Sequence, residues 1–414
     1  MNSTKTPKIK YKYDRGRAIS LVLDESAYED WGSAKSDVKL TEVFINTVFD
    51  DYEGKSKLDQ VDFVFCLPTR ASRFNEEYWP EVYDFLPALK HLDIHYRFAV
   101  LACMPPQKIE LYGRPGDAPH GAVLFVPIFA DMLKDYKNKL LLRREVTKRI
   151  NQATDLAYEK MGAQYVGLGA LLPKLTDFGR KINTDVVTTT GHAGTVWLMQ
   201  ATFEAVIARH FNGESAGLNV GFVGAGSIGM SALENIGIKY NRSKYWVHDT
   251  RPKKNEYARI RMKQRGIDLR ISRSNTELIK TCDIILSAIT SKLDISGIDL
   301  AGKIIIDDSQ PGQFDRDEVE SAGGELVWVV GYDNSSDSYT TRQSGYSYGA
   351  NGLHSANDLW GCEAEVAALA NSKRPDLAIT ADVTPEQVEQ IGRLFKKMKL
   401  GIAEFQSYGR LNDK

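Results

Sequence analysis

The sequence is poor in cysteine, and its four cysteines (Cys66, Cys103, Cys282 and Cys362) are far apart, without a CxxC pair. This spacing provides neither a disulfide framework nor a zinc site, and it is typical of a chain kept in a reducing compartment. No apolar run reaches the roughly 18 residues that a membrane-spanning helix needs. The first residues, MNSTKTPKIKYKYDRGR, lack the apolar core of a signal peptide. We therefore expect a cytoplasmic protein with no transmembrane segment and no bound metal.

The sequence also lacks an excess of either charge. Its 53 Lys and Arg residues and 54 Asp and Glu residues give a formal net charge of −1, which argues against nucleic acid as a partner. A length of 414 residues exceeds what one hydrophobic core usually supports. We expect an N-terminal extension over 1–60, a substrate domain over 61–200, a nucleotide-binding domain over 201–335, and a loop with a C-terminal helical segment over 336–414.

The predicted substrate domain mixes strands with helices. Its apolar patterning predicts a strand at VDFVFCL, a helix near Glu76–Leu89, strands over His95–Met104 and Gly121–Val126, and helices from Pro127 to Gly162. Seven basic residues lie in the last of these segments: Lys134, Lys137, Lys139, Arg143, Arg144, Lys148 and Arg149. They form either a solvated helix face or a docking patch for an acidic or phosphorylated partner.

After a long predicted helix over 195–210, strands alternate with short helices. The predicted strands are LNVGFV, SKYWVHD, DLRI, DIILSA, KIIID and ELVWVV. This alternation favours an α/β fold with a doubly wound parallel sheet of the Rossmann type, beside a second α/β domain. Residues 332–352 read as a loop. A helical region is expected from about residue 357 to the end, broken near Pro375, and it would close the cleft between the domains.

A glycine-rich segment follows the strand LNVGFV. It consists of Gly224, Ala225, Gly226, Ser227, Ile228 and Gly229, and it matches the pattern G-x-G-x-x-G. The first glycine of this pattern permits a tight turn, the second lets a pyrophosphate approach the backbone, and the third lets the next helix lie close to the strand. Asp249 ends the next predicted strand, 20 residues after Gly229, where an acidic residue binds a ribose. The segment therefore predicts a nicotinamide cofactor.

The residues after Asp249 bear on which nicotinamide binds. Asp249 can accept hydrogen bonds from the ribose hydroxyls of NAD(H). Thr250, Arg251 and Lys253 follow at once, and basic side chains there suit the 2′-phosphate of NADP(H). The alternative is that these basic residues are ordinary charged residues of a loop, with no role in cofactor binding. We expect NADP(H), with NAD(H) as the alternative.

Cys362 is a candidate nucleophile because of its place in the sequence. The segment SANDLWGCEAEVAALA begins with residues that cap helices and continues with good helix formers. Cys362 is therefore expected near a helix start, where the helix dipole favours a thiolate. Such a cysteine can attack a thioester and form an acyl-enzyme that accepts hydride from NADPH. Taken alone, it can equally be a small buried hydrophobe.

Several segments between about Asp62 and about Ala370 resemble, in order and spacing, the aldehyde-forming long-chain acyl-[acyl-carrier-protein] reductases. VPIFADML is similar to that family's FLPEML, GLGAL at 167–171 to its ALGGF, and TTGHAGT at 189–195 to its TTGNxxT. DIILSA and IIIDDSQP are similar to its DFIVWVA and LIDGGYP, and WGCEAE to its FACFAE. The resemblance implies that Cys362 accepts the acyl group. It also implies a substrate region that includes Gly169, Thr190, Thr195 and Gln310.

The chain departs from that family at two places. Leu172 and Pro173 stand where the family has Thr-Ser, which removes a polar pocket contact. The glycine turn is one residue shorter than the family's GATGxIG. These departures leave the reaction type plausible and argue against a long fatty acyl substrate.

Four further residues have candidate roles. His354, eight residues before Cys362, can serve as acid or base, or be a surface histidine. The resemblance implies that His192 lies beside the cofactor or substrate. Ser287 and Ala288 follow the strand that usually passes under the nicotinamide. Thr190 and Thr195, named above, orient substrate or cap the following helix.

Together these features predict an NADPH-dependent oxidoreductase that reduces an acyl thioester to an aldehyde through Cys362. The thioester would be carried by acyl carrier protein or coenzyme A, and an aldehyde-consuming enzyme would act next. Two alternatives remain. One is a dehydrogenase or reductase of an alcohol, ketone or imine that forms no covalent intermediate, in which His192 or a lysine moves the proton. The other is a nicotinamide-binding partner protein without turnover.

Overall fold

The computed structural model describes residues 12–68, 82–113, 118, 120–128, 140–183, 185–309, 312–335, 353–355, 357–380 and 382–412. The chain forms two compact units, the first ending at Thr190 and the second beginning at Gly191. The sequence placed this border at residue 200. The structure has it earlier because His192–His210 is one continuous helix, α8, which packs on helices of the second unit.

The first unit contains a five-stranded sheet among its described residues, in the order β2-β3-β1-β4-β5. The strands are β1 (Phe63–Pro68), β2 (Gln107–Tyr112), β3 (Gly121–Val126), β4 (Tyr165–Leu168) and β5 (Val187–Thr189). All pairs are parallel except β2 with β3 at one edge. Every residue of β1 and β3 is buried, which explains their continuous apolar sequences.

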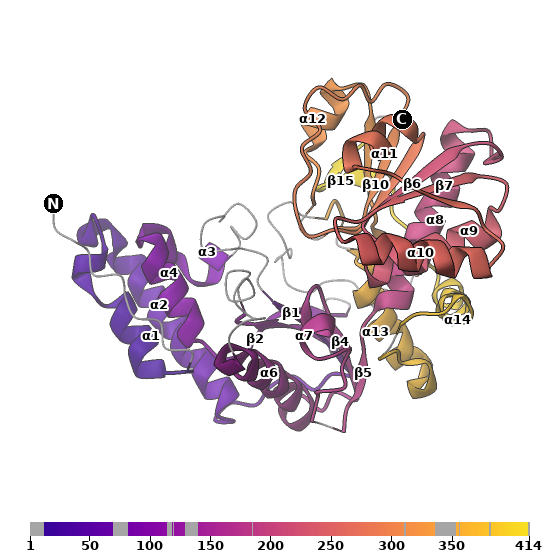
Figure 1. Cartoon of the computed structure of the whole chain (residues 1–414). Helices are drawn as coiled ribbons and strands as arrows, with labels where there is room; N and C mark the ends of the chain where they lie inside the picture. The colour runs from indigo at the N-terminus through magenta and orange to yellow at the C-terminus, as the bar shows by residue number, and fades with distance from the viewer. Residues whose placement is uncertain are drawn as a thin grey trace. The chain divides into compact units, whose positions relative to one another are not determined.

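Three helices, α1 (Arg15–Val22), α2 (Trp31–Tyr52) and α4 (Ile94–Cys103), lie side by side in this unit (Figure 1). The strand predicted over His95–Met104 is therefore wrong. Asp93 caps α4 by accepting a hydrogen bond from the backbone N–H of His95, and the last six residues of the helix are all buried. These six residues are all apolar, so no polar face marks the helical period and the run does not differ from that of a buried strand.

Among the described residues of this unit, the other helices are α3 (Val82–Phe85), the 3-10 turn Pro87–His91, α6 (Leu140–Asp155), the π-helical turn Leu156–Lys160 and α7 (Leu172–Leu175). Arg149 of α6 is fully buried. Its guanidinium donates to the carbonyls of Pro127 and Ala102, and its Nε pairs with Glu145. It is therefore not part of a docking surface.

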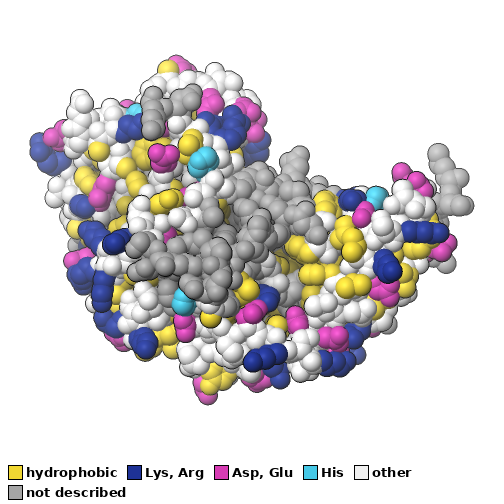
Figure 2. All heavy atoms as spheres, turned by 180° about the vertical axis from the view of Figure 1, so that it is seen from behind, with side chains coloured by type: hydrophobic (Ala, Val, Ile, Leu, Met, Phe, Trp, Pro, Cys, Tyr) yellow, Lys and Arg dark blue, Asp and Glu magenta, His cyan; other side chains and the backbone are white. Residues whose placement is uncertain are grey.

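Three other residues of that proposed basic patch, Lys134, Lys137 and Lys139, lie outside the described residues, as do the first six residues of the helix expected near Glu76–Leu89. On the face shown in Figure 2, basic side chains lie interspersed with acidic ones. Among the described residues, no helix combines the length and the apolar character that crossing a membrane would require.

The second unit is built on a six-stranded sheet among its described residues, in the order β11-β10-β9-β6-β7-β8. The strands are β6 (Asn219–Val223), β7 (Lys244–His248), β8 (Leu269–Ile271), β9 (Ile284–Ser287), β10 (Ile304–Asp307) and β11 (Glu325–Trp328). Every neighbouring pair is parallel. This is the order 3-2-1-4-5-6 of the Rossmann fold, so the expected doubly wound parallel sheet is confirmed.

Helices α9 (Ser227–Lys239), α10 (Pro252–Gln264), α11 (Asn275–Thr281) and α12 (Arg316–Ser321) connect these strands, and α8 packs with them around the sheet (Figure 1). Helices α13 (Gly361–Ser372) and α14 (Pro385–Lys397) follow and pack against α8. The expected break near Pro375 is present as the 3-10 turn Pro375–Leu377.

The chain after α14 is extended rather than helical, which corrects the prediction of a helix to the end. It forms β14 (Leu400–Ile402), β15 (Gln406–Ser407) and β16 (Arg410–Leu411). Strand β14 joins β12 (Gly331–Asp333) and β13 (Asp358–Leu359) in a small antiparallel sheet.

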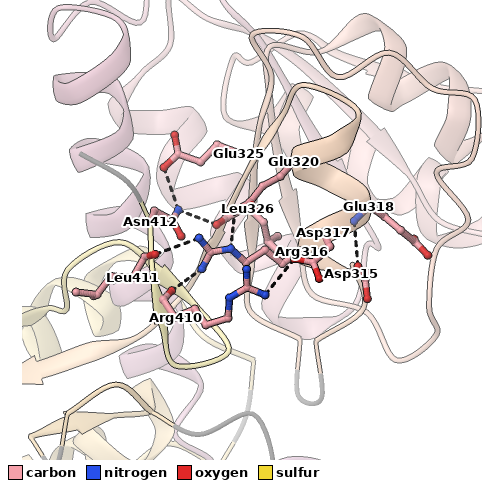
Figure 3. Close-up of polar contacts among 10 residues, drawn as sticks. All are labelled: Asp315, Arg316, Asp317, Glu318, Glu320, Glu325, Leu326, Arg410, Leu411 and Asn412. Carbon is pink, nitrogen blue, oxygen red and sulfur yellow. Dashed lines mark hydrogen bonds and ion pairs between the residues drawn. The ribbon is translucent and has the colours of Figure 1, made fainter.

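Arg316 of α12 anchors this last stretch (Figure 3). Its guanidinium donates to the carbonyls of Arg410 and Leu411, at 2.7 and 3.0 Å. The amide of Asn412 donates to the carboxylate of Glu325 and to the carbonyl of Leu326. The C-terminal segment is thus fixed to α12 and β11 by hydrogen bonds from two side chains, the guanidinium of Arg316 and the amide of Asn412.

Candidate functional site

The strand order of the second sheet reverses between β6 and β9, which are neighbours in space but not in sequence. In such sheets ligands bind outside the carboxyl ends of the strands at this point. The register pairs Val223 with both His248 and Ser287, and Ser287 with Asp307. The residues that come next therefore lie at one level along this edge of the sheet: Gly224, Asp249, Ala288 and Asp308.

The glycine segment forms the turn between β6 and α9, and each glycine has the geometry that its predicted role requires. Gly224 has φ +89°, which other residues rarely adopt. A side chain at Gly229 would place its Cβ 2.2 Å from the carbonyl oxygen of Gly224, so the helix approaches the turn closely. A Cβ at Gly226 would meet nothing within 4 Å. The backbone at Gly226 therefore borders open space.

The start of α9 is arranged to receive an anion. Gly226 is its N-cap residue, and no side chain caps the helix. The N–H groups of the first turn, including those of Ser227 and Ile228, carry the positive end of the helix dipole. His192, the first residue of α8, approaches this turn, with its Nδ1 3.5 Å from the hydroxyl of Ser227. Burial lowers the pKa of His192 to about 4, against an opposing effect of Asp382, so the imidazole is neutral at physiological pH.

Asp249 holds the glycine turn in place. Its carboxylate accepts hydrogen bonds from the N–H of Ala225 and, at 2.9 and 3.0 Å, from the guanidinium of Arg251. Burial alone would raise the pKa of Asp249, but these hydrogen bonds outweigh it and lower the pKa to about 2. Thr250, Arg251 and Lys253 are exposed. The ribose end of a dinucleotide would thus meet an ionised carboxylate that is paired with Arg251, beside other exposed polar and basic side chains.

Ser287 is the last residue of β9 at the same edge, and Ala288 follows it. The hydroxyl of Ser287 lies 3.5 Å from that of Ser309, and Ser309 Oγ accepts a hydrogen bond from the N–H of Ile289. Asp307 is fully buried beneath them and accepts from the N–H groups of Ser309 and Gln313. Burial raises the pKa of Asp307 to about 6, although these hydrogen bonds oppose the rise. This network fixes the loops that follow β9 and β10.

Cys362 lies in the first turn of α13, as predicted. Its surroundings oppose ionisation: burial raises the pKa of the thiol well above its usual range, and the charges of Asp308 and Glu363 raise it further. The expected thiolate at the helix start is therefore not favoured. A side chain at Gly191 would place its Cβ 2.2 Å from the Cβ of Cys362, so Cys362 lies against the start of α8.

The other predicted residues are placed differently. His354 is exposed, and its ring lies 3.2 Å from the carbonyl of Gly409. Thr195 lies in the first turn of α8, whereas Thr190 is buried and its hydroxyl has no hydrogen-bond partner among the described residues. Gly169 belongs to the first unit, where its Cβ would clash with Leu67, so close packing explains the glycine. The predicted substrate residue Gln310 lies outside the described residues.

The structure brings together the glycine turn, His192 and Asp249, and it places Cys362 against Gly191 in the same unit. Asp307 and Asp308 were not among the site residues predicted from the sequence. Their signal is present, because two acidic residues directly follow the buried apolar run of β10. Among the described residues, no cluster of His, Cys, Asp and Glu side chains is arranged to hold a metal ion.

The strand order and the glycine turn define the Rossmann class of dinucleotide-binding folds. No protein-family profile matches the chain. No curated protein matches it.

Distant likenesses to solved structures are found. L-tryptophan dehydrogenase from Nostoc punctiforme is 13% identical over 82% of this chain and 89% of that one, with a TM-score of 0.33. Δ1-pyrroline-2-carboxylate reductase from Thermococcus litoralis, solved with NADH and L-proline, is 18% identical over 28% of this chain and 36% of that one, with a TM-score of 0.24. TarJ from S. aureus, solved with NADPH, is 16% identical over 32% of this chain and 42% of that one, with a TM-score of 0.24.

The match to the pyrroline-carboxylate reductase spans about a third of that protein's length, and the match to a dipicolinate synthase from Bacillus halodurans spans 60% of the solved chain. None of these names is that of an acyl-[acyl-carrier-protein] reductase. At such low TM-scores the likenesses add nothing to what the strand order already establishes.

Proposed function

We propose that the chain is a nicotinamide-dependent dehydrogenase or reductase that acts on an alcohol, ketone or imine without a covalent intermediate. The observation that carries this proposal is the open space before Gly226 at the uncapped start of α9, at the reversal point of the sheet. A bound nicotinamide supplies or accepts hydride, and the residues of the chain bind it, orient it and manage the proton. The buried, neutral imidazole of His192 is one such proton acceptor.

The test is a fluorescence titration with NADPH and NADH on wild type and two glycine variants. Gly226→Ala has room for its methyl group and an ordinary backbone conformation, with φ −73°. It should fold normally and lose cofactor affinity by tenfold or more, because the methyl group occupies the phosphate's place. Gly229→Ala should lose both stability and affinity. Wild type that binds neither cofactor would refute the proposal.

We propose NADP(H) as the preferred cofactor. Arg251 already neutralises Asp249, and its side chain remains 60% exposed, so it can turn to a 2′-phosphate. Arg251→Ala should weaken NADPH binding about tenfold and leave NADH binding nearly unchanged. An equal loss for both cofactors would instead assign Arg251 to the support of the glycine turn.

Reduction of an acyl thioester, carried by acyl carrier protein or coenzyme A, is the second candidate. Its support is the position of Cys362 in the first turn of α13, against the start of α8; the raised pKa of the thiol weighs against it. Intact mass after incubation with acyl thioesters, without NADPH, separates the two. An adduct on wild type that is absent from Cys362→Ala would favour the covalent reaction, with a downstream enzyme to take the aldehyde.

A purely sensory role would give cofactor binding with no oxidation or reduction of any carbonyl, imine, alcohol or thioester offered.

A cytoplasmic location is part of the proposal. It is supported by the four cysteines, none of which forms a disulfide.

A further inference from the structure

Asp308 and Asp249 occupy equivalent positions in the two halves of the Rossmann sheet. Asp249 directly follows β7, the second strand of the first half, and Asp308 directly follows β10, the second strand of the second half. Each half of this fold binds one mononucleotide. Since the half with Asp249 and the glycine turn receives the adenosine side, the half with Asp308 receives the nicotinamide side.

The two carboxylates also face the same side of the sheet. Side chains alternate along a strand. On β10, Ile305 packs in the cluster with Leu278 of α11 and Val319 of α12, so Asp307 faces that side and Asp308 faces the other. On β7, Trp246 packs against the same cluster, which places Asp249 on the side of Asp308.

The two carboxylates differ in their partners. Asp249 is held by Arg251 and Ala225. For the carboxylate of Asp308, no hydrogen bond or ion pair occurs among the described residues; only its backbone N–H is engaged, with the carbonyl of Ser287. Burial, together with the neighbouring charge of Asp307, raises the pKa of Asp308 well above its usual value. A partly buried carboxyl without a cation beside it is suited to hold a proton.

The titratable groups at the end of β10 and at the starts of α13 and α8 are already engaged or neutral. Asp307 accepts two backbone hydrogen bonds on the opposite side of the sheet. On α13, Glu363 accepts from the N–H of Trp360 and Glu365 from the N–H of Gly194, while the raised pKa of Cys362 keeps the thiol neutral. At the start of α8, the imidazole of His192 is neutral.

We propose that Asp308 is the counter-ion of the oxidised nicotinamide ring, and that it releases a proton when the oxidised cofactor binds and keeps it when the reduced cofactor binds. The inference rests on the proposed function. The oxidised ring carries a positive charge that the reduced ring lacks, and an opposite charge within a few ångströms favours the ionised carboxylate. In the reductive direction, the proton that Asp308 loses balances the one that a carbonyl or imine gains with the hydride.

Calorimetry without any substrate tests this. Binding of NAD⁺, NADH, NADP⁺ and NADPH is measured in buffers of different ionisation enthalpy, which counts the protons released. Wild type should release up to one proton with the oxidised form and essentially none with the reduced form, at a pH below the pKa of free Asp308. Over that range, each unit by which the pH is lowered should weaken binding of the oxidised form about tenfold relative to the reduced form.

Asp308→Asn should abolish the proton release and lower the preference for the oxidised form about tenfold or more. Asp249→Asn is the matched control: it changes the affinity of both redox forms together and leaves the proton count unchanged. The inference is overturned if both redox forms bind wild type with equal proton counts. It is also overturned if the release survives in Asp308→Asn and disappears in Asp307→Asn or His192→Gln. Failure of either cofactor to bind wild type would instead refute the proposed function itself.

Discussion

His192 shows how one buried side chain couples this site to pH. Its pKa is lowered from 6.5 in the unfolded chain to about 4 in the folded protein, chiefly by burial. Above pH 6.5 the residue is neutral in both states. As the pH falls from 6.5 toward 4, only the unfolded state takes up the proton, so the folded state loses about 1.4 kcal/mol per pH unit. Below both pKa values the loss is complete.

Urea denaturation at several pH values between 4.5 and 7.5 should reveal this loss as a difference between wild type and His192→Gln. The comparison is needed because Asp307, with its pKa raised to about 6, acts oppositely: its folded-state proton favours folding as the pH falls from 6 toward 3.8. Removing His192 should therefore make the stability of the variant fall less steeply with acid than that of wild type. Parallel curves would show that His192 has the same pKa in the folded and unfolded states, so that folding does not lower it.

At the scale of elements, the starts of α8 and α13 pack backbone against backbone. A Cβ at Gly194 would lie 2.2 Å from the carbonyl oxygen of Gly361, and a Cβ at Gly361 would lie 2.5 Å from the Cα of Thr195. Glu365 adds a 2.7 Å hydrogen bond from the N–H of Gly194. Rigid backbone cannot yield as a side chain can.

Gly194→Ala should therefore lower the free energy of unfolding by roughly 1–3 kcal/mol or more, despite the better helix propensity of alanine. Gly237→Ala in α9 is the control, since its Cβ would meet only the movable ends of the Met262 and Ile267 side chains. Chemical denaturation of both variants measures the difference. Equal stabilities would mean that α8 and α13 separate easily.

The sequence predicted the Rossmann unit well because its signals are local: six apolar runs, a glycine turn, and an acidic residue at the next strand end. It failed for α4 because the last six residues of this helix are all buried and apolar, so no polar face shows the helical period. It also expected Cys362 to ionise from its place at a helix start. The structure opposes this because Asp308, which lies far away in the sequence, and burial outweigh the helix dipole. Such effects depend on tertiary neighbours that no single segment encodes.

Arg316 ties the end of the chain into the second unit, with only 8% of its side chain exposed. Arg316→Lys keeps the charge but cannot donate to the carbonyls of Arg410 and Leu411 from one planar group. It should destabilise the second unit by roughly 1–3 kcal/mol. Arg374→Lys, in an exposed pair with Asp376, is a matched control that should change stability little. Thermal denaturation compares the two variants. Equal melting midpoints would show that the hydrogen bonds from Arg316 to Arg410 and Leu411 contribute nothing to stability.

For the whole molecule, the division into two units implies that a cofactor acts unequally on them. The glycine turn, Asp249 and Asp308 all belong to the second unit, whereas α1, α2 and α4 pack within the first. A ligand at 100 times its dissociation constant adds about 2.7 kcal/mol to the stability of the state that binds it. Hydrogen exchange with saturating NADPH should therefore slow markedly in β6, α9 and β7 and remain unchanged in α1 and α2. Equal slowing in both units would mean that they open as one cooperative body, and the cofactor would then stabilise the entire chain.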